Sequence, residues 1–223
     1  MGPIGRGEIH VWLAGIRVPA EVLARMADVL DEGERERAAR FRFHDDRARS
    51  TVARAALRQL LGGYLGRDPR ALRFTSGAQG KPALTGKELQ FNVSHSGERV
   101  AIAIGPAGPV GIDIEHERDL HDAVMLAHRF FSPNEAAAVE RDPSLFLPIW
   151  TAKESVIKAI GGGLSIDLAS FEAFASPERF APVTNLTGWH VRALPMPGAG
   201  YYGALCAQGD ALEVSVREWS FPR

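Results

Sequence analysis

The sequence predicts an α+β (α/β) fold made of two similar halves, and three observations support that prediction. Short runs in which apolar and polar residues alternate, as in half-buried strands, occur in both halves of the chain. Segments with apolar residues at helical spacing stand between them, at 57–65 and 149–160. Residues 53–62 also resemble residues 152–161, which suggests an internal duplication. We therefore expect halves of residues 1–110 and 111–223 that meet at a cleft, where ligands often bind.

Composition and charge narrow the class of protein. The 223 residues are 45% hydrophobic and 24% charged, as in ordinary globular proteins. A net charge of -1 gives no reason to expect nucleic acid or an acidic membrane as a partner. The single cysteine, Cys206, excludes an internal disulfide and a cysteine-based metal cluster. With neither a leader pattern nor an apolar run of membrane-spanning length, we expect a cytoplasmic protein without a membrane partner.

The spacing of apolar residues, together with residues typical of helix ends and turns, predicts the individual helices and strands. Alternation predicts strands near 9–14, 91–94, 100–104, 110–115, 189–194, 201–206 and 212–219. Helices are predicted at 19–30, around 57–65, at 119–131, from 133 onward, and at 148–160. Ser132, Pro133 and Glu135 form a capping-box signature, which gives that glutamate a sufficient structural role.

An arginine-rich segment precedes and enters the first long helix. Residues 34–58 contain eight arginines against four acidic residues. Arg40, Arg47, Arg54 and Arg58 have the spacing to share one helix face. The segment is either a solvated helix laced with salt bridges or a phosphate-binding patch, to which the planar guanidinium is suited.

Two carboxylates stand near the middle of the chain on a predicted strand. Asp113 and Glu115 share one strand face, while Ile112 and Ile114 point to the other. Neighbouring carboxylates repel each other, and a hard cation such as Mg²⁺ would relieve that repulsion. A strand with a charged outer face is the alternative, and for this short pattern alone it is favoured.

A polar stripe follows the helix at 148–160. Trp150, Glu154 and Lys158 recur every four residues and so lie on one face. An ordinary Glu–Lys helix pair would explain them. Alternatively, Glu154 is a third carboxylate for the cation, and Lys158 meets a phosphate one turn away.

Two turn-rich segments complete the candidates. The loop at 76–82 presents Lys81 directly before the stiff Pro82. The hairpin at 91–104 brings Ser94 and His95 to a strand end, where polar side chains can reach a ligand. Because no G-x-S-x-G motif is present, the serine–histidine pair does not indicate an acyl-transfer triad.

Taken together, these blocks resemble a known family. Residues 91–97 (FNVSHSG), 111–115 (GIDIE) and 150–158 (WTAKESVIK) occur in that order, with 80–82 (GKP) and 130–135 (FFSPNE) as lesser blocks. They resemble the signature blocks of the Sfp-type 4′-phosphopantetheinyl transferases. The resemblance implies a fold of two halves related by pseudo-two-fold symmetry with coenzyme A (CoA) between them. It also implies transfer of the phosphopantetheine arm to a serine of an apo acyl or peptidyl carrier protein, releasing adenosine 3′,5′-bisphosphate.

The resemblance also implies roles for individual residues. Asp113, Glu115 and Glu154 would hold Mg²⁺, with Mn²⁺ as the alternative ion, against the CoA pyrophosphate. Glu154 would also be the base for the carrier serine, and Lys158 a phosphate contact. The CoA-binding residues implied on the first half are Arg37 and Arg49 for the 3′-phosphate, Lys81 and Pro82 for the adenine, and Ser94 and His95 for phosphate groups. Glu34 departs from the pattern, because some members carry a lysine there.

Two other classes of function stay open at this point. A binding module would hold CoA or a carrier without chemistry, and a Mg²⁺-dependent phosphohydrolase would release free phosphopantetheine. Duplicated halves that supply both walls of a cleft predict an active monomer. The exposed member of the apolar group at 124–126, which we expect to be Met125, is predicted to contact the carrier.

Overall fold

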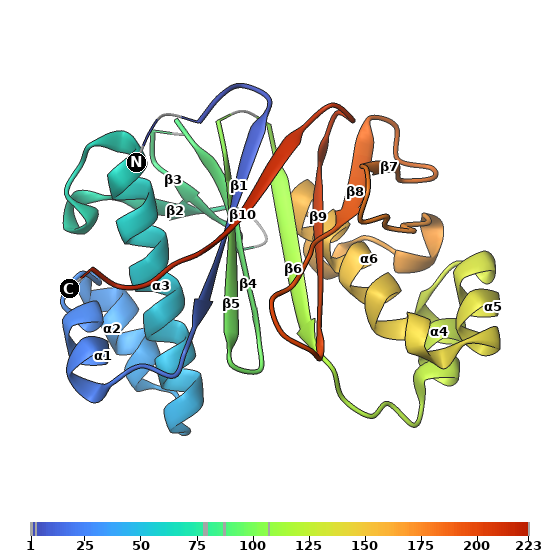
Figure 1. Cartoon of the computed structure of the whole chain (residues 1–223), viewed down its shortest axis with the longest axis horizontal. Helices are drawn as coiled ribbons and strands as arrows, with labels where there is room; N and C mark the ends of the chain where they lie inside the picture. The colour runs from blue at the N-terminus through green and yellow to red at the C-terminus, as the bar shows by residue number, and fades with distance from the viewer. Residues whose placement is uncertain (1, 3, 78–79, 87, 107, 223) are drawn as a thin grey trace.

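The computed structural model describes residues 2, 4–77, 80–86, 88–106 and 108–222. Helices form the outer layer on each side, and two four-stranded sheets lie between them (Figure 1). The helices are α1 Ala20–Ala27, α2 Glu32–Ala39, α3 His44–Leu65, α4 Ala123–Phe130, α5 Pro133–Arg141 and α6 Phe146–Ile160, with 3₁₀ turns η1 Pro69–Ala71, η2 Pro143–Leu145, η3 Gly163–Ser165 and η4 Leu168–Ser170. The strands are β1 Glu8–Gly15, β2 Phe74–Ser76, β3 Pro82–Leu84, β4 Gln90–Ser96, β5 Arg99–Gly105, β6 Val110–His116, β7 Ala181–Pro182, β8 Trp189–Ala193, β9 Tyr201–Gln208 and β10 Glu213–Glu218.

The first sheet has the order β10-β1-β5-β4, and the second has the order β6-β9-β8-β7. Strand alternation decides which residues face the neighbouring sheet. Ile9, Val11 and Leu13 of β1 meet Ile112 and Ile114 of β6 in a core between the two sheets. The opposite faces pack against α1 and α3 on one side and against α6 on the other.

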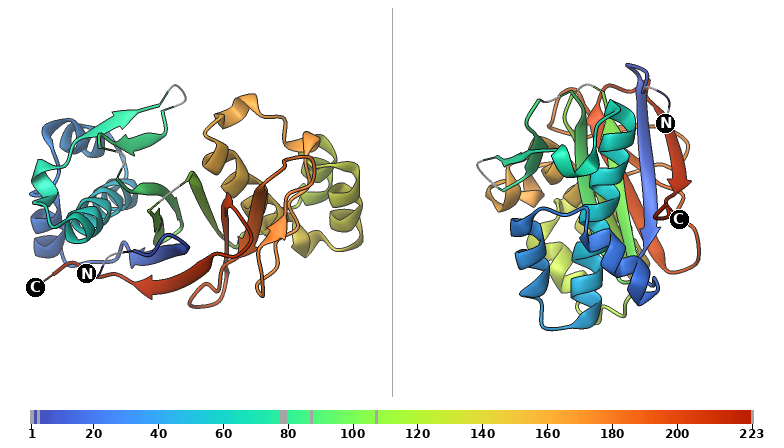
Figure 2. Two further views of the ribbon diagram at one scale, coloured as in Figure 1. Left: turned by 90° about the horizontal axis from the view of Figure 1, so that it is seen from above. Right: turned by 90° about the vertical axis from the view of Figure 1, so that its left-hand side faces the viewer.

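The last strand returns to the first half. β10 pairs in parallel with β1, with Glu8 opposite Glu213 and Leu13 opposite Glu218. Figure 2 shows this strand crossing from the second half towards the N-terminus. The sheets therefore do not divide the chain simply at residue 111, and the two-fold relation between the halves stays a prediction.

Most predicted elements are present, with shifted ends. The helix predicted at 119–131 begins only at Ala123, and the one predicted at 148–160 begins at Phe146 with Pro148 in its first turn. The arginine-rich segment contains two helices, because α2 ends at Ala39 and α3 begins at His44. Of the loop at 76–82, residues 78 and 79 lie outside the described residues. Within the described residues, no helix combines the length and apolarity that crossing a bilayer requires.

The capping box at the start of α5 is confirmed, and it is tied to a buried ion pair. Glu135 accepts a hydrogen bond from the Ser132 backbone N–H, and its second oxygen accepts one from Ala173 N–H. The Lys153 ammonium of α6 lies 2.5 Å from the same carboxylate, and both side chains are fully buried. It also donates to the Phe171 carbonyl at 2.6 Å. This pair joins α5 and α6 to the segment that leads into β7.

Candidate functional site

Three adjoining pockets form one groove along β4, and Val93 lines all three. The first has a volume of about 450 Å³ and lies against α2 and α3. The second, about 300 Å³, lies beside the C-terminal end of α6. The third, about 310 Å³, lies over β6 and the polar stripe of α6. The groove therefore runs from the helices of the first half to those of the second.

All ten residues predicted for the site line this groove. Arg37, Arg49, Pro82 and His95 line the first pocket. The second is lined by Lys81, Pro82, Glu154 and Lys158, and the third by Ser94, His95, Asp113, Glu115, Glu154 and Lys158. The structure thus brings to one groove residues that are up to 121 positions apart in the sequence, from Arg37 to Lys158.

The floor of the groove is a seam of side-chain hydrogen bonds between β4 and β6. One edge of β6 pairs with β9, which leaves the N–H groups of alternate residues on the other edge without backbone partners. Three side chains of β4, two residues apart, accept those hydrogen bonds: Ile112 N–H donates to Asn92 Oδ1 (2.9 Å), Ile114 N–H to Ser94 Oγ (3.3 Å) and His116 N–H to Ser96 Oγ (3.0 Å). The seam joins the two sheets at the point where the pockets meet.

The same seam orients the two carboxylates. The Ser94 hydroxyl donates to Asp113 Oδ1 at 2.8 Å, and the Ser96 hydroxyl donates to Glu115 Oε2 at 2.9 Å. Ser94 is buried, so its hydroxyl positions Asp113. Arg118 lies 3.2 Å from Glu115 at the outer end of the strand.

Asp113 forms an ion pair with Lys158 of α6. The Lys158 ammonium lies 2.5 Å from Asp113 Oδ1 and 3.0 Å from Ser94 Oγ. The pair is open to the groove, since the Lys158 side chain is 28% exposed. Burial raises the pKa of Asp113, and the interactions with Lys158 and Ser94 offset only part of that rise.

Glu154 lies one turn before Lys158 and lines the same pocket. Burial, and next the charge of Asp113, raise the pKa of Glu154, while Lys158 acts in the opposite direction. A carboxyl group with a raised pKa is a better proton acceptor when ionised than one with an ordinary pKa. Its position is thus suited to acid–base chemistry near the carboxylates of β6.

The donor set suits a hard divalent cation. Within the described residues, no three His, Cys, Asp or Glu side chains lie close enough together to enclose a metal ion. However, Asp113 Oδ2 is buried and has no hydrogen-bond partner among them, and the charges of Asp113 and Glu115 both raise the pKa of Glu154. Carboxylate oxygens are the ligands that Mg²⁺ prefers, so the residues present fit such an ion.

Close packing of α6 on β6 brings the helix residues to the strand residues. A Cβ atom on Gly111 would lie 2.0 Å from the Ser155 carbonyl oxygen and 2.3 Å from the Ala159 nitrogen. Only glycine permits this approach, which explains why it precedes the carboxylate pattern. Glu154 and Lys158 then reach the β6 face that carries Asp113.

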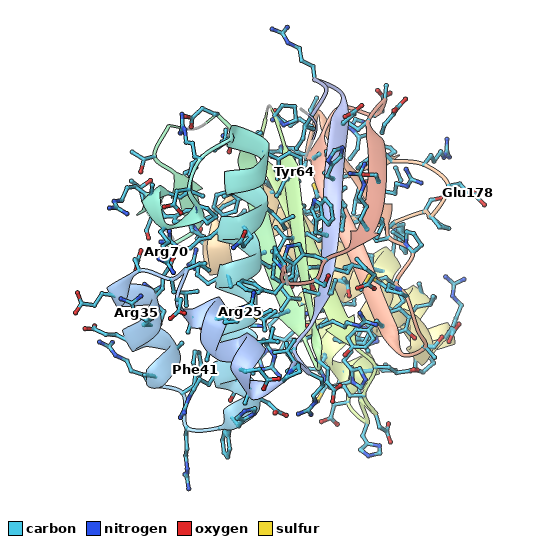
Figure 3. The ribbon with its side chains drawn as sticks, turned by 60° about the vertical axis from the view of Figure 1, so that its left-hand side comes forward. Arg25, Arg35, Phe41, Tyr64, Arg70 and Glu178 are labelled. Atoms are coloured by element: carbon cyan, nitrogen blue, oxygen red, sulfur yellow. The ribbon has the colours of Figure 1, made fainter. Side chains whose placement is uncertain are left out.

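The end of the groove beside α3 is lined with cations. Arg49 donates to the Gly97 carbonyl at 2.8 Å and to Asp46 at 2.6 Å, which ties α3 to the β4–β5 turn. Burial lowers the pKa of His95, and the positive charge of Arg49 acts in the same direction. Arg54, Ser50 and Phe41 also line this pocket. In Figure 3, Phe41 lies at the opposite end of α3 from Tyr64.

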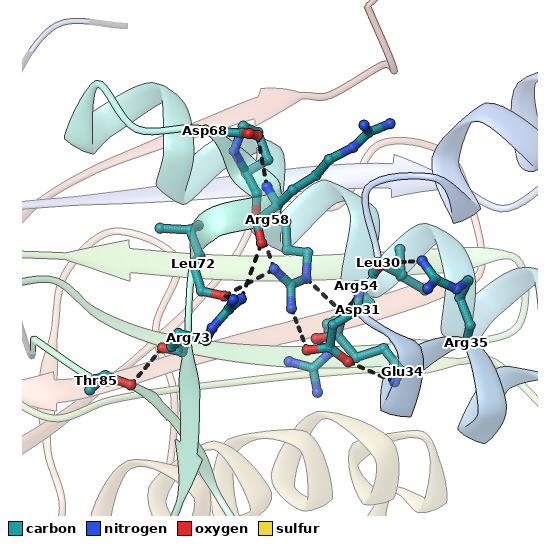
Figure 4. A network of polar contacts seen from close by, with 12 residues as sticks. Leu30, Asp31, Glu34, Arg35, Arg54, Arg58, Asp68, Leu72, Arg73 and Thr85 are labelled. Carbon is teal, nitrogen blue, oxygen red and sulfur yellow. Dashed lines mark hydrogen bonds and ion pairs between the residues drawn. The ribbon is translucent and has the colours of Figure 1, made fainter.

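The predicted shared face of four arginines is wrong for Arg40, whereas Arg54 and Arg58 share a face of α3, since both pair with Glu34. Arg40 caps α2 and does not lie on α3. Arg58 is fully buried and pairs with Asp31 and Glu34, each at 2.6 Å (Figure 4). A buried guanidinium needs such partners, so Arg58 holds α2 against α3 instead of facing a ligand. The departure at Glu34 thereby has a structural explanation.

Lys81 lies in the groove wall, but its ammonium group is directed at backbone. It donates to the carbonyls of Val110 (3.0 Å), Lys158 (2.5 Å) and Ala159 (3.3 Å). Burial lowers the pKa of Lys81 to about 8. Pro82, the next residue, lines the first two pockets.

Sequence reasoning missed several residues of the groove: Asn92 and Ser96 of the seam, Ser50 of the cation-lined end, and the wall residue Phe41. The sequence contains a pattern from which the seam between β4 and β6 could have been predicted. Polar residues at 92, 94 and 96 repeat in step with 112, 114 and 116. No comparable signal separates Arg54 from the buried Arg58.

Family models and individual relatives of known function all point to the same family of proteins. Residues 109–206 match the model of the 4′-phosphopantetheinyl transferase superfamily, and residues 19–107 match the model of the N-terminal part of 4′-phosphopantetheinyl transferases. The chain is 34% identical over 196 residues to the 4′-phosphopantetheinyl transferase HetI of Nostoc sp., covering 84% of this chain and 82% of that protein. It is 32% identical over 153 residues to the 4′-phosphopantetheinyl transferase Sfp of Bacillus subtilis strain 168, covering 66% and 67% respectively.

Proposed function

The chain belongs to the Sfp-type 4′-phosphopantetheinyl transferases, and we propose that it moves the phosphopantetheine arm of CoA onto a serine of an apo acyl or peptidyl carrier protein. Adenosine 3′,5′-bisphosphate is the second product. One observation carries the proposal: a single groove has arginines at one end and an open carboxylate–lysine cluster at the other. CoA has the same polarity, with a 3′-phosphate at one end and the reacting pyrophosphate further along.

The arginine end is suited to the adenosine 3′-phosphate. Arg37 and Arg49 present planar, multi-donor groups to the first pocket, and charge-assisted hydrogen bonds to phosphate are strong. His95 lies between this pocket and the carboxylate pocket, where it can donate to a phosphate oxygen. Pro82 offers an apolar surface to the adenine ring.

The carboxylate end is suited to the pyrophosphate and to Mg²⁺. Asp113, Glu115 and Glu154 would hold the ion, and Mn²⁺ has a similar ligand preference. When bound, the ion polarises phosphoryl oxygens and neutralises the charge of the leaving group. The Lys158 ammonium is positioned to donate to a phosphate oxygen in the same pocket.

The transfer itself needs one base and one leaving group. The carrier serine Oγ forms a bond to the β-phosphorus of CoA, while the bond from that phosphorus to the bridging oxygen breaks. Glu154 takes the serine proton, and adenosine 3′,5′-bisphosphate leaves with the bridging oxygen. Positioning and charge neutralisation supply most of the catalysis in reactions of this type.

One chain supplies both walls of the groove, so we also propose that the protein acts as a monomer. Its cytoplasmic location stays a prediction. Sedimentation during turnover tests the oligomeric state. Activity confined to a dimer or trimer would contradict it.

The proposed reaction is tested by incubating the protein with CoA, Mg²⁺ and a panel of apo acyl and peptidyl carriers, and weighing all products. We expect a carrier heavier by one phosphopantetheine group and an equal amount of adenosine 3′,5′-bisphosphate. Free phosphopantetheine in the absence of a carrier would indicate a phosphohydrolase. CoA retained without any product would indicate a binding module.

A further inference from the structure

We propose that the Lys81 side chain is a positioning group that holds the last turn of α6 against β6 and so fixes the location of Lys158. Lys81 belongs to the first half of the chain, whereas two of its acceptors, Lys158 and Ala159, belong to the second half, and the third, Val110, begins β6 at the boundary between the halves. The catalytic consequence of this inference rests on the proposed function. Its structural consequence does not.

The contacts use the full donor capacity of an ammonium group. Lys81 Nζ carries three hydrogens, and three backbone carbonyl oxygens surround it, those of Val110, Lys158 and Ala159. The side chain is half-buried, so these bonds form in a partly dry environment. No hydrogen on this group is then left over for a ligand in the groove.

The acceptors are groups that need a partner. The last four carbonyls of a helix have no partner within the helix. Gly161, in the left-handed conformation, closes α6 by donating to the Ile157 carbonyl, and the carbonyls of Lys158 and Ala159 come next. A cation at this end also interacts favourably with the helix dipole.

Lys81 therefore controls the backbone from which Lys158 extends. The carbonyl of Lys158 accepts from Lys81, while its own ammonium reaches Asp113 at 2.5 Å and Ser94 at 3.0 Å. Val110, the third acceptor, begins the strand that carries Asp113. One ammonium group thus fixes both elements that meet in the open ion pair.

Two roles of Lys81 can be told apart by kinetics: contact with the adenine of CoA and positioning of Lys158. A residue that contacts the adenine, which CoA and dephospho-CoA share, would mainly raise KM for both donors and leave kcat unchanged. A residue that positions Lys158 would affect the chemical step with every donor. Misplacing a reacting group by about 1 Å can lower a rate by about a hundredfold, so the second role has a measurable signature in kcat.

The test replaces Lys81 by Met, which keeps an unbranched stem out to the Cε position and removes the ammonium donors. We expect kcat to fall by about tenfold or more, by the same factor with CoA and with dephospho-CoA, and KM to change little. Lys81→Arg should restore part of the loss. Arg37→Gln supplies the contrast, because loss of a phosphate contact should weaken the preference for CoA over dephospho-CoA, a preference that Lys81→Met should leave unchanged.

Amide hydrogen exchange supplies a second readout that needs neither donor nor carrier. In Lys81→Met, the amides of residues 157–161 should exchange faster, while those of α3 should not. If Lys81→Met does not fold, Lys81→Gln, which keeps two donor hydrogens, should give an intermediate effect. A wild-type protein that transfers nothing would overturn the proposed function, yet exchange would still test this inference.

Two results would overturn the positioning role. One is a variant with a raised KM for CoA and an unchanged kcat, as loss of an adenine contact would give. The other is unchanged exchange in the last turn of α6 together with unchanged kcat.

Discussion

Two lysines of helix α6 form ion pairs with carboxylates at the same nitrogen–oxygen distance but in different surroundings. The Lys153–Glu135 and Lys158–Asp113 pairs both measure 2.5 Å between ammonium nitrogen and carboxylate oxygen. The first pair is fully buried, and both Glu135 oxygens accept hydrogen bonds. In the second pair, Lys158 is partly exposed and Asp113 Oδ2 has no partner among the described residues.

The difference shows that unused bonding capacity, and not distance, separates the two pairs. In the Lys153–Glu135 pair, which we call the closed pair, both carboxylate oxygens already accept hydrogen bonds, so the pair contributes to structure and not to ligand binding. In the Lys158–Asp113 pair, which we call the open pair, Asp113 Oδ2 is buried beside a pocket without a partner among the described residues. Burying a charged oxygen in this way is costly unless a ligand binds it. Perturbed carboxyl groups in pockets are accordingly candidates for function.

The largest expected effect is on stability, from opening the closed pair. Lys153→Met should lower the free energy of unfolding by about 3–5 kcal/mol, because it leaves the Glu135 carboxylate buried and unpaired. Urea unfolding measures this loss. Turnover per folded molecule, at a temperature where the variant is folded, should stay near that of the wild type. A loss below about 1 kcal/mol, typical of an exposed pair, would contradict the distinction.

Removing the carboxylate charge of the open pair should lower turnover without lowering stability, the reverse of what is expected for Lys153→Met. Asp113→Asn is expected to cut turnover by about 10²–10³-fold, as loss of a key electrostatic group does. Because burial raises the pKa of Asp113 above its unfolded value, the ionised side chain destabilises the fold at pH 7. The free energy of unfolding should therefore stay level or rise. A large loss of stability would make this pair structural as well.

The pH dependence sharpens the same comparison. Glu154 must be ionised to accept the serine proton, and burial raises its pKa above 4.5. The acid limb of kcat/KM should therefore lie above that value, with activity rising as pH rises through it. Glu154→Gln should cut kcat by about 10²-fold, weaken CoA binding far less, and flatten the limb. A variant that turns over like the wild type would move the base elsewhere, with His95 next.

The smallest effect is expected on the exposed face of α4. Met125 of α4 is 61% exposed, so the side chain is accessible to a partner. Met125→Asp should raise the carrier KM by a few-fold, about 1 kcal/mol, as for a peripheral apolar contact, and leave the CoA KM and the unfolding free energy unchanged. An unchanged carrier KM would place the carrier on another surface.

The sequence was informative where periodicity and short motifs determine structure. Alternation around Asp113 and the four-residue spacing of Glu154 and Lys158 predicted which side chains share a face, and the structure places them in one pocket. It was less informative where tertiary partners decide the role of a residue. Nothing local distinguishes the buried Arg58 from Arg54, or indicates that Lys81 reaches backbone carbonyls 77 positions away.

The central claim is that the open pair belongs to a metal site and the closed pair does not. Mn²⁺ binding in the presence of CoA, followed by the loss of the free-ion electron paramagnetic resonance signal, tests it most directly. We expect a saturable site in the wild type that Asp113→Asn loses and Lys153→Met keeps. Equal binding by wild type and Asp113→Asn would contradict the account.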